Sequence, residues 1–382
     1  MDFSFSEEDD LLREVLRKYA LEQLLPDYAS WKERPFPREK IEELGELGVL
    51  GIRIPQEYGG MSGSFVSLGV ATEELSRGDF NVSYFLQLGT IAAAILGNGA
   101  PEEIKSEWLP AVASGEKVLS FGLTEPSVGS DAANLATMAL PEGSDFLITG
   151  EKASITFAGF ADACIVFART GGPGARGISS FFVPLDLPGV SRQVYSSAGG
   201  HLSRRGSLFF DSVRVPATNR IGEEGVGFVQ AMTAFDFNRS VIALACIGTA
   251  MQAMDETILY TKERTTFGKP LAKHEGVAFQ VAEHLAQLHA ARLLAYEVLS
   301  LADAGKKHTA ESAMAKWLGP KFSVEAIHAC MLLHGWSGYG TDMPFSQRLQ
   351  DVIGLEVGDG TPEIMKSVIA REVYGREFAA YK

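Results

Sequence analysis

The chain has 382 residues, which exceeds the length at which one hydrophobic core stops growing, so two or three structural units are expected. Its 46% hydrophobic and 21% charged residues are typical of a globular protein and exclude a disordered or fibrous chain. The formal net charge of −14 argues against nucleic acid or an anionic membrane as a partner, because both need a basic surface, although a local basic pocket for phosphates is still allowed.

The cysteines and the N-terminus bear on metal binding and location. Cys164, Cys246 and Cys330 are widely separated in apolar surroundings without metal-ligand spacing, which predicts buried free thiols and no metal site. The acidic N-terminus lacks the basic and apolar regions of a signal peptide, and no apolar run approaches the length of a membrane span. We therefore expect a cytoplasmic protein without membrane insertion.

The first part of the chain, residues 6–115, is predicted to be helical. Ser6 followed by acidic residues is an N-cap signal, and the next apolar residues keep the 3.6-residue period of a helix. The apolar residues of this first helix are Leu11, Leu12, Val15, Leu16 and Tyr19. Further helical patterns are found at 39–47, 66–75 and 82–96.

Near residue 117 the pattern changes to short apolar runs separated by Gly, Pro, Asp and Ser, which predicts a compact β unit. The predicted strands are 118–123, 146–149, 164–168, 179–183 and 208–215. Long helical patterns then return to the end of the chain, and Pro320 should kink or split one of them. These helices are predicted at 225–263, 273–304, 309–333 and 362–379.

The order of helices, strands and helices indicates an α+β protein with domains at 1–116, 117–224 and 225–382. It departs from the βαβ alternation of a doubly wound dinucleotide fold, so no Rossmann domain is expected. The glycine-rich stretch 171–177 lies between two predicted strands and opens no helix, so it is interpreted as a hairpin loop and not as a phosphate loop.

Residues 121–131 form a predicted strand that runs into a loop of small, hydroxyl-bearing and glycine residues. Such a loop can bring backbone N–H groups and the hydroxyls of Thr124 and Ser130 close to a phosphate or a polar ring system. Taken alone, it can also be a capped turn.

Two further segments combine charges with helix geometry. Asp236 and Arg239 are spaced i, i+3 and share a helix face, which suits ligand binding or, alternatively, a solvated intrahelical ion pair. Arg264 offers a planar fork for pyrophosphate and Phe267 an apolar surface, where Gly268 should end the helix. The alternative for Arg264 is a surface arginine at a helix terminus.

A glycine-rich loop at 356–364 places Asp359 between Gly358 and Gly360 before the last helix. Catalytic groups concentrate on such loops, and the flanking glycines allow a ligand to approach closely. The alternative is an ordinary turn aspartate.

Several of these segments resemble the acyl-CoA dehydrogenase family in the same order. The run TEPSVGSD at 124–131 resembles the TEPxxGSD signature, and ERTTFGK at 263–269 resembles ERxxFGK. Residues 151–156 resemble the family strand along the isoalloxazine, and 234–239 its CoA-binding helix. The resemblance implies a helical N-terminal domain, a middle β-barrel or sandwich domain and a C-terminal four-helix bundle.

The resemblance also implies FAD as the cofactor, a CoA thioester as the substrate, an electron-transfer flavoprotein as the acceptor and a homotetramer. Asp359 would remove the α-proton, because Asn238, at a position where some members carry the base, cannot accept a proton. The residues implied to bind substrate are Ser130, Asp236, Arg239, Gly358 and Gly360. Those implied to bind the cofactor are Phe121, Leu123, Thr124, Gly129, Ser130, Ser154, Thr156, Arg264, Phe267, Gly335, Gly338, Thr361 and Glu363.

Departures from the family pattern bear on the acyl group. Ser154, Gly358 and Asp359 are smaller than the tryptophan, tyrosine and glutamate that are usual there, which favours a branched, alicyclic or bulky acyl group. Opposing this, Trp336 or Phe157 could refill the space.

Three alternatives stay open. One is a flavin oxidase that resembles nitroalkane oxidase, in which an aspartate is the usual base. The second is a dehydrogenase of carrier-protein thioesters. The third is a flavin-binding scaffold without turnover.

Overall fold

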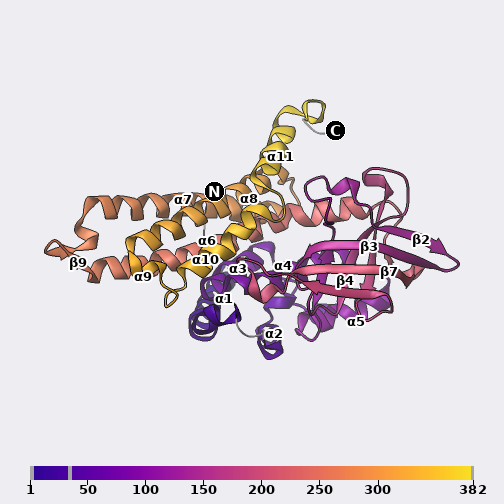
Figure 1. Cartoon of the computed structure of the whole chain (residues 1–382), viewed down its shortest axis with the longest axis horizontal. Helices are drawn as coiled ribbons and strands as arrows, with labels where there is room; N and C mark the ends of the chain where they lie inside the picture. Colours follow the sequence, from indigo (N-terminus) through magenta and orange to yellow (C-terminus); the bar gives the residue numbers. More distant parts are fainter. Residues whose placement is uncertain (1–3, 33–36, 380–382) are drawn as a thin grey trace. The chain divides into compact units, whose positions relative to one another are not determined.

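The computed structural model describes residues 4–32 and 37–379, which form two compact units (Figure 1). Among these residues, the first unit takes the N-terminal segment, Phe65–Ser83 and the chain from Asp236 onward. The second takes residues 37–64 and Tyr84–Phe235. The N-terminal helices therefore divide between the units, and the division of the sequence at 116 and 224 stays a prediction.

The second unit is built on an eight-stranded sheet in the order β6-β7-β3-β2-β4-β5-β8, with β1 paired to β4 (Figure 1). Neighbours are antiparallel, except that β4 is parallel to β1 and to one residue of β2. Within the described residues this is not a doubly wound sheet, as predicted. The strands are β1 (Leu119–Gly122), β2 (Met138–Glu142), β3 (Asp145–Ile155), β4 (Ala163–Arg169), β5 (Ile178–Pro184), β6 (Val190–Val194), β7 (Gly206–Pro216) and β8 (Arg220–Ile221).

All five predicted strands are present, and 171–177 connects the antiparallel strands β4 and β5, which confirms the hairpin. The strands β2, β6 and β8 were not predicted. Most residues of β2 and β6 are exposed, so these strands lack the apolar alternation from which a strand is predicted. The helices α2 (Arg38–Glu46), α5 (Glu102–Ala113) and most of α4 (Ser83–Gly97) complete this unit.

The first unit is helical, and its N-terminal helix begins as predicted, because the Oγ of Ser6 accepts a hydrogen bond from the N–H of Asp9 at 3.0 Å. Buried carboxylates join its helices: Arg17 donates to Glu74 at 2.7 Å and Arg292 to Glu73 at 2.7 Å. The helices are α1 (Glu7–Tyr19), α3 (Phe65–Gly78), α6 (Gly227–Glu263), α7 (Glu275–Asp303), α8 (Thr309–Leu333), α9 (Trp336–Tyr339), α10 (Phe345–Val357) and α11 (Pro362–Tyr374), and α6 begins in the other unit.

Helix α8 has the bounds that were predicted and runs through Pro320 without splitting. It lies close against α6, because a Cβ on Gly319 would be 2.6 Å from the Cβ of Ala243. The short helices α9 and α10 were not predicted, and α11 ends five residues earlier than 379, at Tyr374. The close approach of α8 to α6 positions part of the candidate site.

The expectation that no apolar run reaches the length of a membrane span was wrong. By length and composition, Phe80–Gly97 and Gly227–Glu263 could each cross a membrane. In the most apolar window of each, 83% and 78% of the residues are buried inside the protein. A helix in the core of a protein can also be this long and apolar, and the burial of these two segments is typical of core helices.

Candidate active site

In the second unit, a buried ion pair fixes the loop after β1 to strand β3. The Nζ of Lys152, whose side chain is 0% exposed, donates to Glu125 Oε1 at 2.7 Å and to Leu123 O at 3.2 Å. The N–H of Ala153 donates to Thr124 O at 2.9 Å. These contacts bring the predicted flavin-binding loop beside the end of β3, where Ser154 lies.

Both carboxylate oxygens of Glu125 accept hydrogen bonds, since the N–H groups of Ala136 and Thr137 also donate to them, at 2.6 Å and 2.8 Å. Burial works to raise the pKa of Glu125, but the charge of Lys152 and these hydrogen bonds outweigh it and lower the pKa. The Lys152–Glu125 pair was not predicted from the sequence. The pattern that could have indicated it is the position of Lys152 on β3, on the same inward-facing side as Phe146 and Ile148.

Most of the predicted flavin contacts around this loop are at least partly accessible, and the turn after β3 is strained. Ser154 has φ 57° and Phe157 φ 66°, a left-handed conformation that costs a non-glycine residue roughly 1–3 kcal/mol and clusters at ligand sites. The N–H of Phe157 donates to Ser203 O at 2.7 Å and holds this turn. Gly129, Ser130 and Ser154 are exposed, Phe121, Thr124 and Thr156 are half-buried, and Leu123 is buried.

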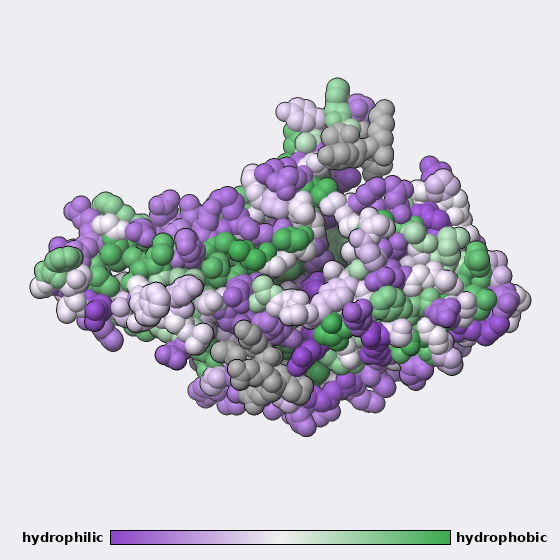
Figure 2. Space-filling view, in the orientation of Figure 1, coloured by the Kyte–Doolittle hydropathy of each residue, from purple (hydrophilic) through white to green (hydrophobic). Residues whose placement is uncertain are grey.

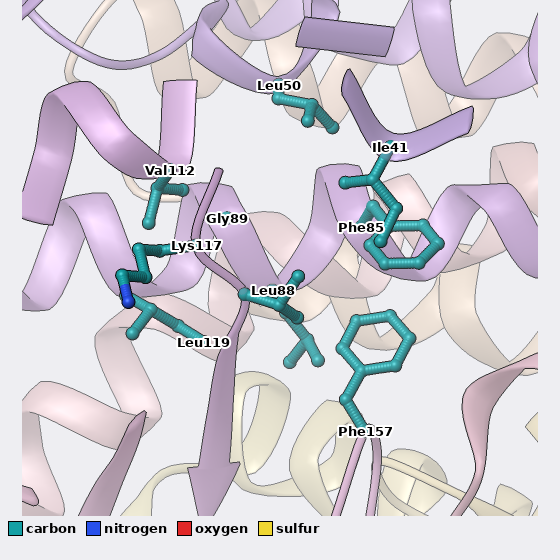
Figure 3. Close-up of a pocket in the computed structure, with 10 residues that line it drawn as sticks. Ile41, Leu50, Phe85, Leu88, Gly89, Val112, Lys117, Leu119 and Phe157 are labelled. Carbon is teal, nitrogen blue, oxygen red and sulfur yellow. The ribbon is translucent and has the colours of Figure 1, made fainter. Parts of the chain in front are cut away.

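Phe157 belongs to the apolar core of the second unit. Its side chain is 0% exposed and stacks on Phe85, with 4.4 Å between the ring centroids (Figure 3). The two rings border a cavity of about 20 Å³, also lined by Leu50, Leu88 and Val112. A cavity of this size holds about one water molecule, so it is too small for an acyl group.

In the first unit, Arg239 Nη1 and Asp236 Oδ1 are 2.9 Å apart within α6, and Thr309 Oγ1 on α8 donates to the other oxygen of Asp236 at 2.9 Å. The pair is intrahelical, and its two sides differ in exposure: Arg239 is only 7% exposed, whereas Asp236 is half-buried. Burial lowers the pKa of Arg239, against the opposing charges of Asp236 and Asp359. Among the described residues, Arg239 Nε and Asn238 Oδ1 are buried without a hydrogen-bond partner, as at a site that a ligand completes.

The candidate base lies in a short loop between α10 and α11. Asp359 is exposed and has φ 56°, and Gly360 has φ 105°. On one side the N–H of Gly358 donates to Gly354 O at 2.9 Å, and on the other the Oγ1 of Thr361 caps α11. The loop therefore holds the carboxylate of Asp359 toward solvent from a backbone that is fixed at both ends.

Two buried cations act on Asp359: Arg239, and Lys316 on α8, which is 2% exposed and donates from Nζ to Gly360 O. Lys316 was not predicted as a site residue from the sequence. The pattern that could have indicated its burial is its place on the helix face of small residues formed by Ser312, Gly319 and Ser323.

The segment that contains Arg264 differs from its prediction. Helix α6 ends at Glu263, so the prediction that Gly268 ends it was wrong. Gly268 instead lies in a hairpin in which Thr266 pairs with Lys269. The tip residues Phe267 and Gly268 have φ 49° and 77°, which is typical of a type I′ turn.

At this tip Phe267 is 94% exposed, and no ion pair to the exposed Arg264 occurs within the described part of the chain. An unpaired guanidinium beside a bare aromatic ring has the chemistry to bind a pyrophosphate and an adenine, so these residues fit FAD.

The turn at 335–338 carries an exposed aromatic pair. Gly335 has φ 62°, and a Cβ on Gly338 would lie 2.4 Å from Met331 O. Trp336 is 84% exposed, with its ring 5.4 Å from that of Tyr339, so it fills no cavity within its unit. Glu363 is exposed on α11 near Lys366.

The structure thus groups the predicted residues by unit. The loop after β1 and the end of β3 belong to the second unit, whereas Asp236, Arg239, Arg264 and the Asp359 loop belong to the first. No group of His, Cys, Asp and Glu that could hold a metal ion occurs in residues 4–32 and 37–379.

Comparison with known proteins gives consistent matches along the chain. The N-terminal, middle and C-terminal domains of acyl-CoA dehydrogenase match residues 6–116, 120–213 and 225–374. The short-chain specific acyl-CoA dehydrogenase of Clostridium acetobutylicum is 34% identical, over 98% of this chain and 100% of its own. The caffeyl-CoA reductase-Etf complex subunit CarC of Acetobacterium woodii is also 34% identical, over 96% and 98%.

Among solved structures, the glutaryl-coenzyme A dehydrogenase glutaryl-CoA complex is 30% identical, with a TM-score of 0.95, and the match covers 100% of this chain and 99% of that one. The fold and these matches define an oxidoreductase that acts on CH–CH bonds. The chain belongs to the acyl-CoA dehydrogenase family, with its N-terminal helical, middle β-sheet and C-terminal helical domains.

Proposed function

We propose that this enzyme is an FAD-dependent dehydrogenase of an acyl-CoA with a branched, alicyclic or otherwise bulky acyl group, and that Asp359 is its base. The observation that carries the proposal is the Asp359 loop. An exposed carboxylate in a left-handed conformation follows Gly358 and precedes Gly360, while two cations near it are buried.

Asp359 removes the α-proton of the thioester, and the electron pair of the broken C–H bond becomes the new Cα–Cβ π bond. FAD, when bound, supplies the acceptor for the hydride that leaves Cβ. The backbone N–H of Asp359 donates to the thioester oxygen, on which negative charge develops as the proton leaves. Asp236 and Arg239 bind the CoA moiety.

The cofactor would be held by Thr124, Ser154 and Thr156 in the second unit of one subunit. The exposed tip with Arg264 and Phe267 would reach the FAD of a neighbouring subunit, and a homotetramer accounts for its exposure. Figure 2 shows hydrophobic residues gathered in a band over the helices, and Phe279, Leu293 and Leu332 of these helices are exposed. Such surfaces are typical of subunit contacts.

The acceptor is proposed to be an electron-transfer flavoprotein, in the cytoplasm. The relative from Acetobacterium woodii is a subunit of a caffeyl-CoA reductase-Etf complex, which supports this acceptor. The competing oxidase would pass electrons to O₂ instead. Fast reoxidation of the reduced, ligand-bound flavin by air would therefore favour the oxidase, and slow reoxidation the dehydrogenase.

The acyl-group proposal rests on the small side chains of Ser154, Gly358 and Asp359. Gly358→Tyr tests it, because Gly358 has φ −67° and a Cβ there would meet its nearest atom, Gly354 O, at an ordinary 3.4 Å. We expect turnover of cyclohexanecarboxyl-CoA to fall ~10-fold or more relative to a linear acyl-CoA of equal carbon number, because misplacement by about 1 Å can cost ~10²-fold. Equal effects on both substrates would contradict the wide pocket.

The proposal as a whole is tested by anaerobic titration of the purified protein with linear, branched and cyclic acyl-CoAs while the flavin absorbance is followed. We expect FAD, and not FMN, on denaturation and bleaching by a cyclic or branched thioester. If flavin binds but no CoA or carrier-protein thioester bleaches it, the enzyme is not a dehydrogenase of this kind.

A further inference from the structure

The backbone around Asp359 is held at its ends but not at its centre. The N–H of Gly358 and the hydroxyl of Thr361 are engaged with α10 and α11. Between them, Asp359 and Gly360 both have positive φ, and their carbonyls belong to no helix. A contact from another element is needed to define where the carboxylate points.

Lys316 provides that contact from α8. Its Nζ donates to Gly360 O, 44 residues further along the chain. No carboxylate lies within ion-pair distance of this Nζ among the residues of the described part of the chain, and Lys316 is 2% exposed. An ammonium is rarely buried against a single neutral carbonyl, because the loss of hydration is then poorly compensated.

The charged and titratable groups that act on Lys316 are Asp359 in the loop after α10, Cys246 and Arg239 on α6, and Glu356 on α10. Burial lowers the pKa of Lys316 to about 8, and the charge of Asp359 is the main opposing effect. Asp236 is already engaged by Arg239 and Thr309, so it does not compensate Lys316. Asp359 is therefore the principal counter-charge of this lysine.

We propose that Lys316 is a positioning residue for the reaction: its ammonium fixes the carbonyl of Gly360 and, by attracting the carboxylate of Asp359, orients the base toward the α-proton. This inference rests on the proposed function, because it takes Asp359 as the base. It adds a residue that touches neither substrate nor cofactor.

The pH dependence follows from the charge of Lys316. Because burial lowers its pKa to about 8, the ammonium is present below that pH and is lost as the pH rises through it. The rate of flavin reduction should therefore decline on the alkaline side near pH 8. We call this decline the alkaline limb, and its loss in a Lys316 variant that keeps FAD bound would assign it to this ammonium.

The test uses the FAD-loaded enzyme and its anaerobic reduction by butyryl-CoA and cyclohexanecarboxyl-CoA between pH 6 and pH 10. Lys316→Met should lower the maximal rate by ~10- to 10²-fold, as expected for a misplaced base. It should also abolish the alkaline limb while FAD stays bound. Lys316→Arg should restore most of the rate and move the limb to higher pH, because arginine stays charged.

Lys321→Met is the matched control, since Lys321 lies on the same helix and pairs with Glu325 at 2.5 Å; it should behave as the wild type. If Lys316→Met keeps the wild-type rate and limb, the inference is overturned. If Lys316→Met does not fold, Lys316→Arg decides, and an unshifted limb overturns the inference.

Asp359→Asn separates this inference from the function on which it rests. If Asp359→Asn abolishes reduction and the lysine variants change nothing, only the role of Lys316 is wrong. If Asp359→Asn reduces flavin normally, the base itself is misassigned and both proposals fall.

Discussion

Among the residues whose side chains the structure describes, two lysines are buried, and they differ in what surrounds them. Lys152 in the β-sheet unit has a carboxylate at 2.7 Å and a backbone carbonyl at 3.2 Å. Lys316 in the helical unit has a backbone carbonyl and an exposed aspartate that acts on it only from a distance. Burial lowers the pKa of both to about 8.

The difference matches the role proposed for each region. The Lys152–Glu125 pair holds the loop that is proposed to contact FAD, and complete pairing keeps such a loop fixed. As the proposed base, Asp359 would gain a proton in every turnover, and a tight ion pair would oppose that step. A cation that attracts the base without a direct ion pair orients it and leaves it reactive.

The largest effect should come from breaking the complete pair. Lys152→Met leaves the carboxylate of Glu125 buried without its cation, which typically costs about 3–5 kcal/mol of unfolding free energy. Urea unfolding followed by circular dichroism would measure this loss. The double variant Lys152→Met, Glu125→Gln should recover part of it, and no recovery would show that the cost comes from packing.

A smaller effect is expected at the exposed cation of the hairpin tip. Arg264→Ala removes a charged hydrogen-bond donor, worth about 1.5–3 kcal/mol, so FAD should bind ~10- to 10²-fold more weakly. Flavin fluorescence would follow the binding. Lys273→Ala removes an exposed charge nearby and is the control. Equal affinities in the two variants would exclude Arg264 from the FAD site.

The smallest effect on stability should be that of Lys316→Met. Its main counter-charge, Asp359, is exposed, so the substitution leaves no buried carboxylate without a cation. We expect a change within about 1 kcal/mol. A loss as large as that of Lys152→Met would mean that the two lysines have the same structural role.

The long elements of the fold could be predicted because they carry periodic patterns. Helix α8 was predicted with its full bounds, and the five apolar strands were all found. Two of the kinds of element that were missed have a clear physical reason. Polar strands such as β6 depend on a neighbouring strand, and the hairpin at Phe267 depends on two residues that adopt positive φ.

Candidate site residues could be proposed where a motif is local in the sequence. The Asp359 loop and the Asp236–Arg239 pair were proposed because their residues lie within a few positions of one another, and the structure contains both, while their roles stay predictions. Lys316 and Lys152 were missed, since their partners lie 44 and 27 residues away and only the folded chain brings them together. In both cases, the pattern that indicates a buried lysine is its position among apolar or small residues on one face of a strand or helix.

The central claim is that Asp359 is the base, and one pair of variants tests it most directly. The rate of anaerobic flavin reduction by a saturating acyl-CoA would be compared for the wild type, Asp359→Asn and Asp342→Asn, the last being the same substitution at an exposed loop aspartate. We predict a loss of at least ~10²- to 10⁴-fold for Asp359→Asn with FAD still bound, and none for Asp342→Asn. A normal rate in Asp359→Asn would contradict the assignment and place the base elsewhere.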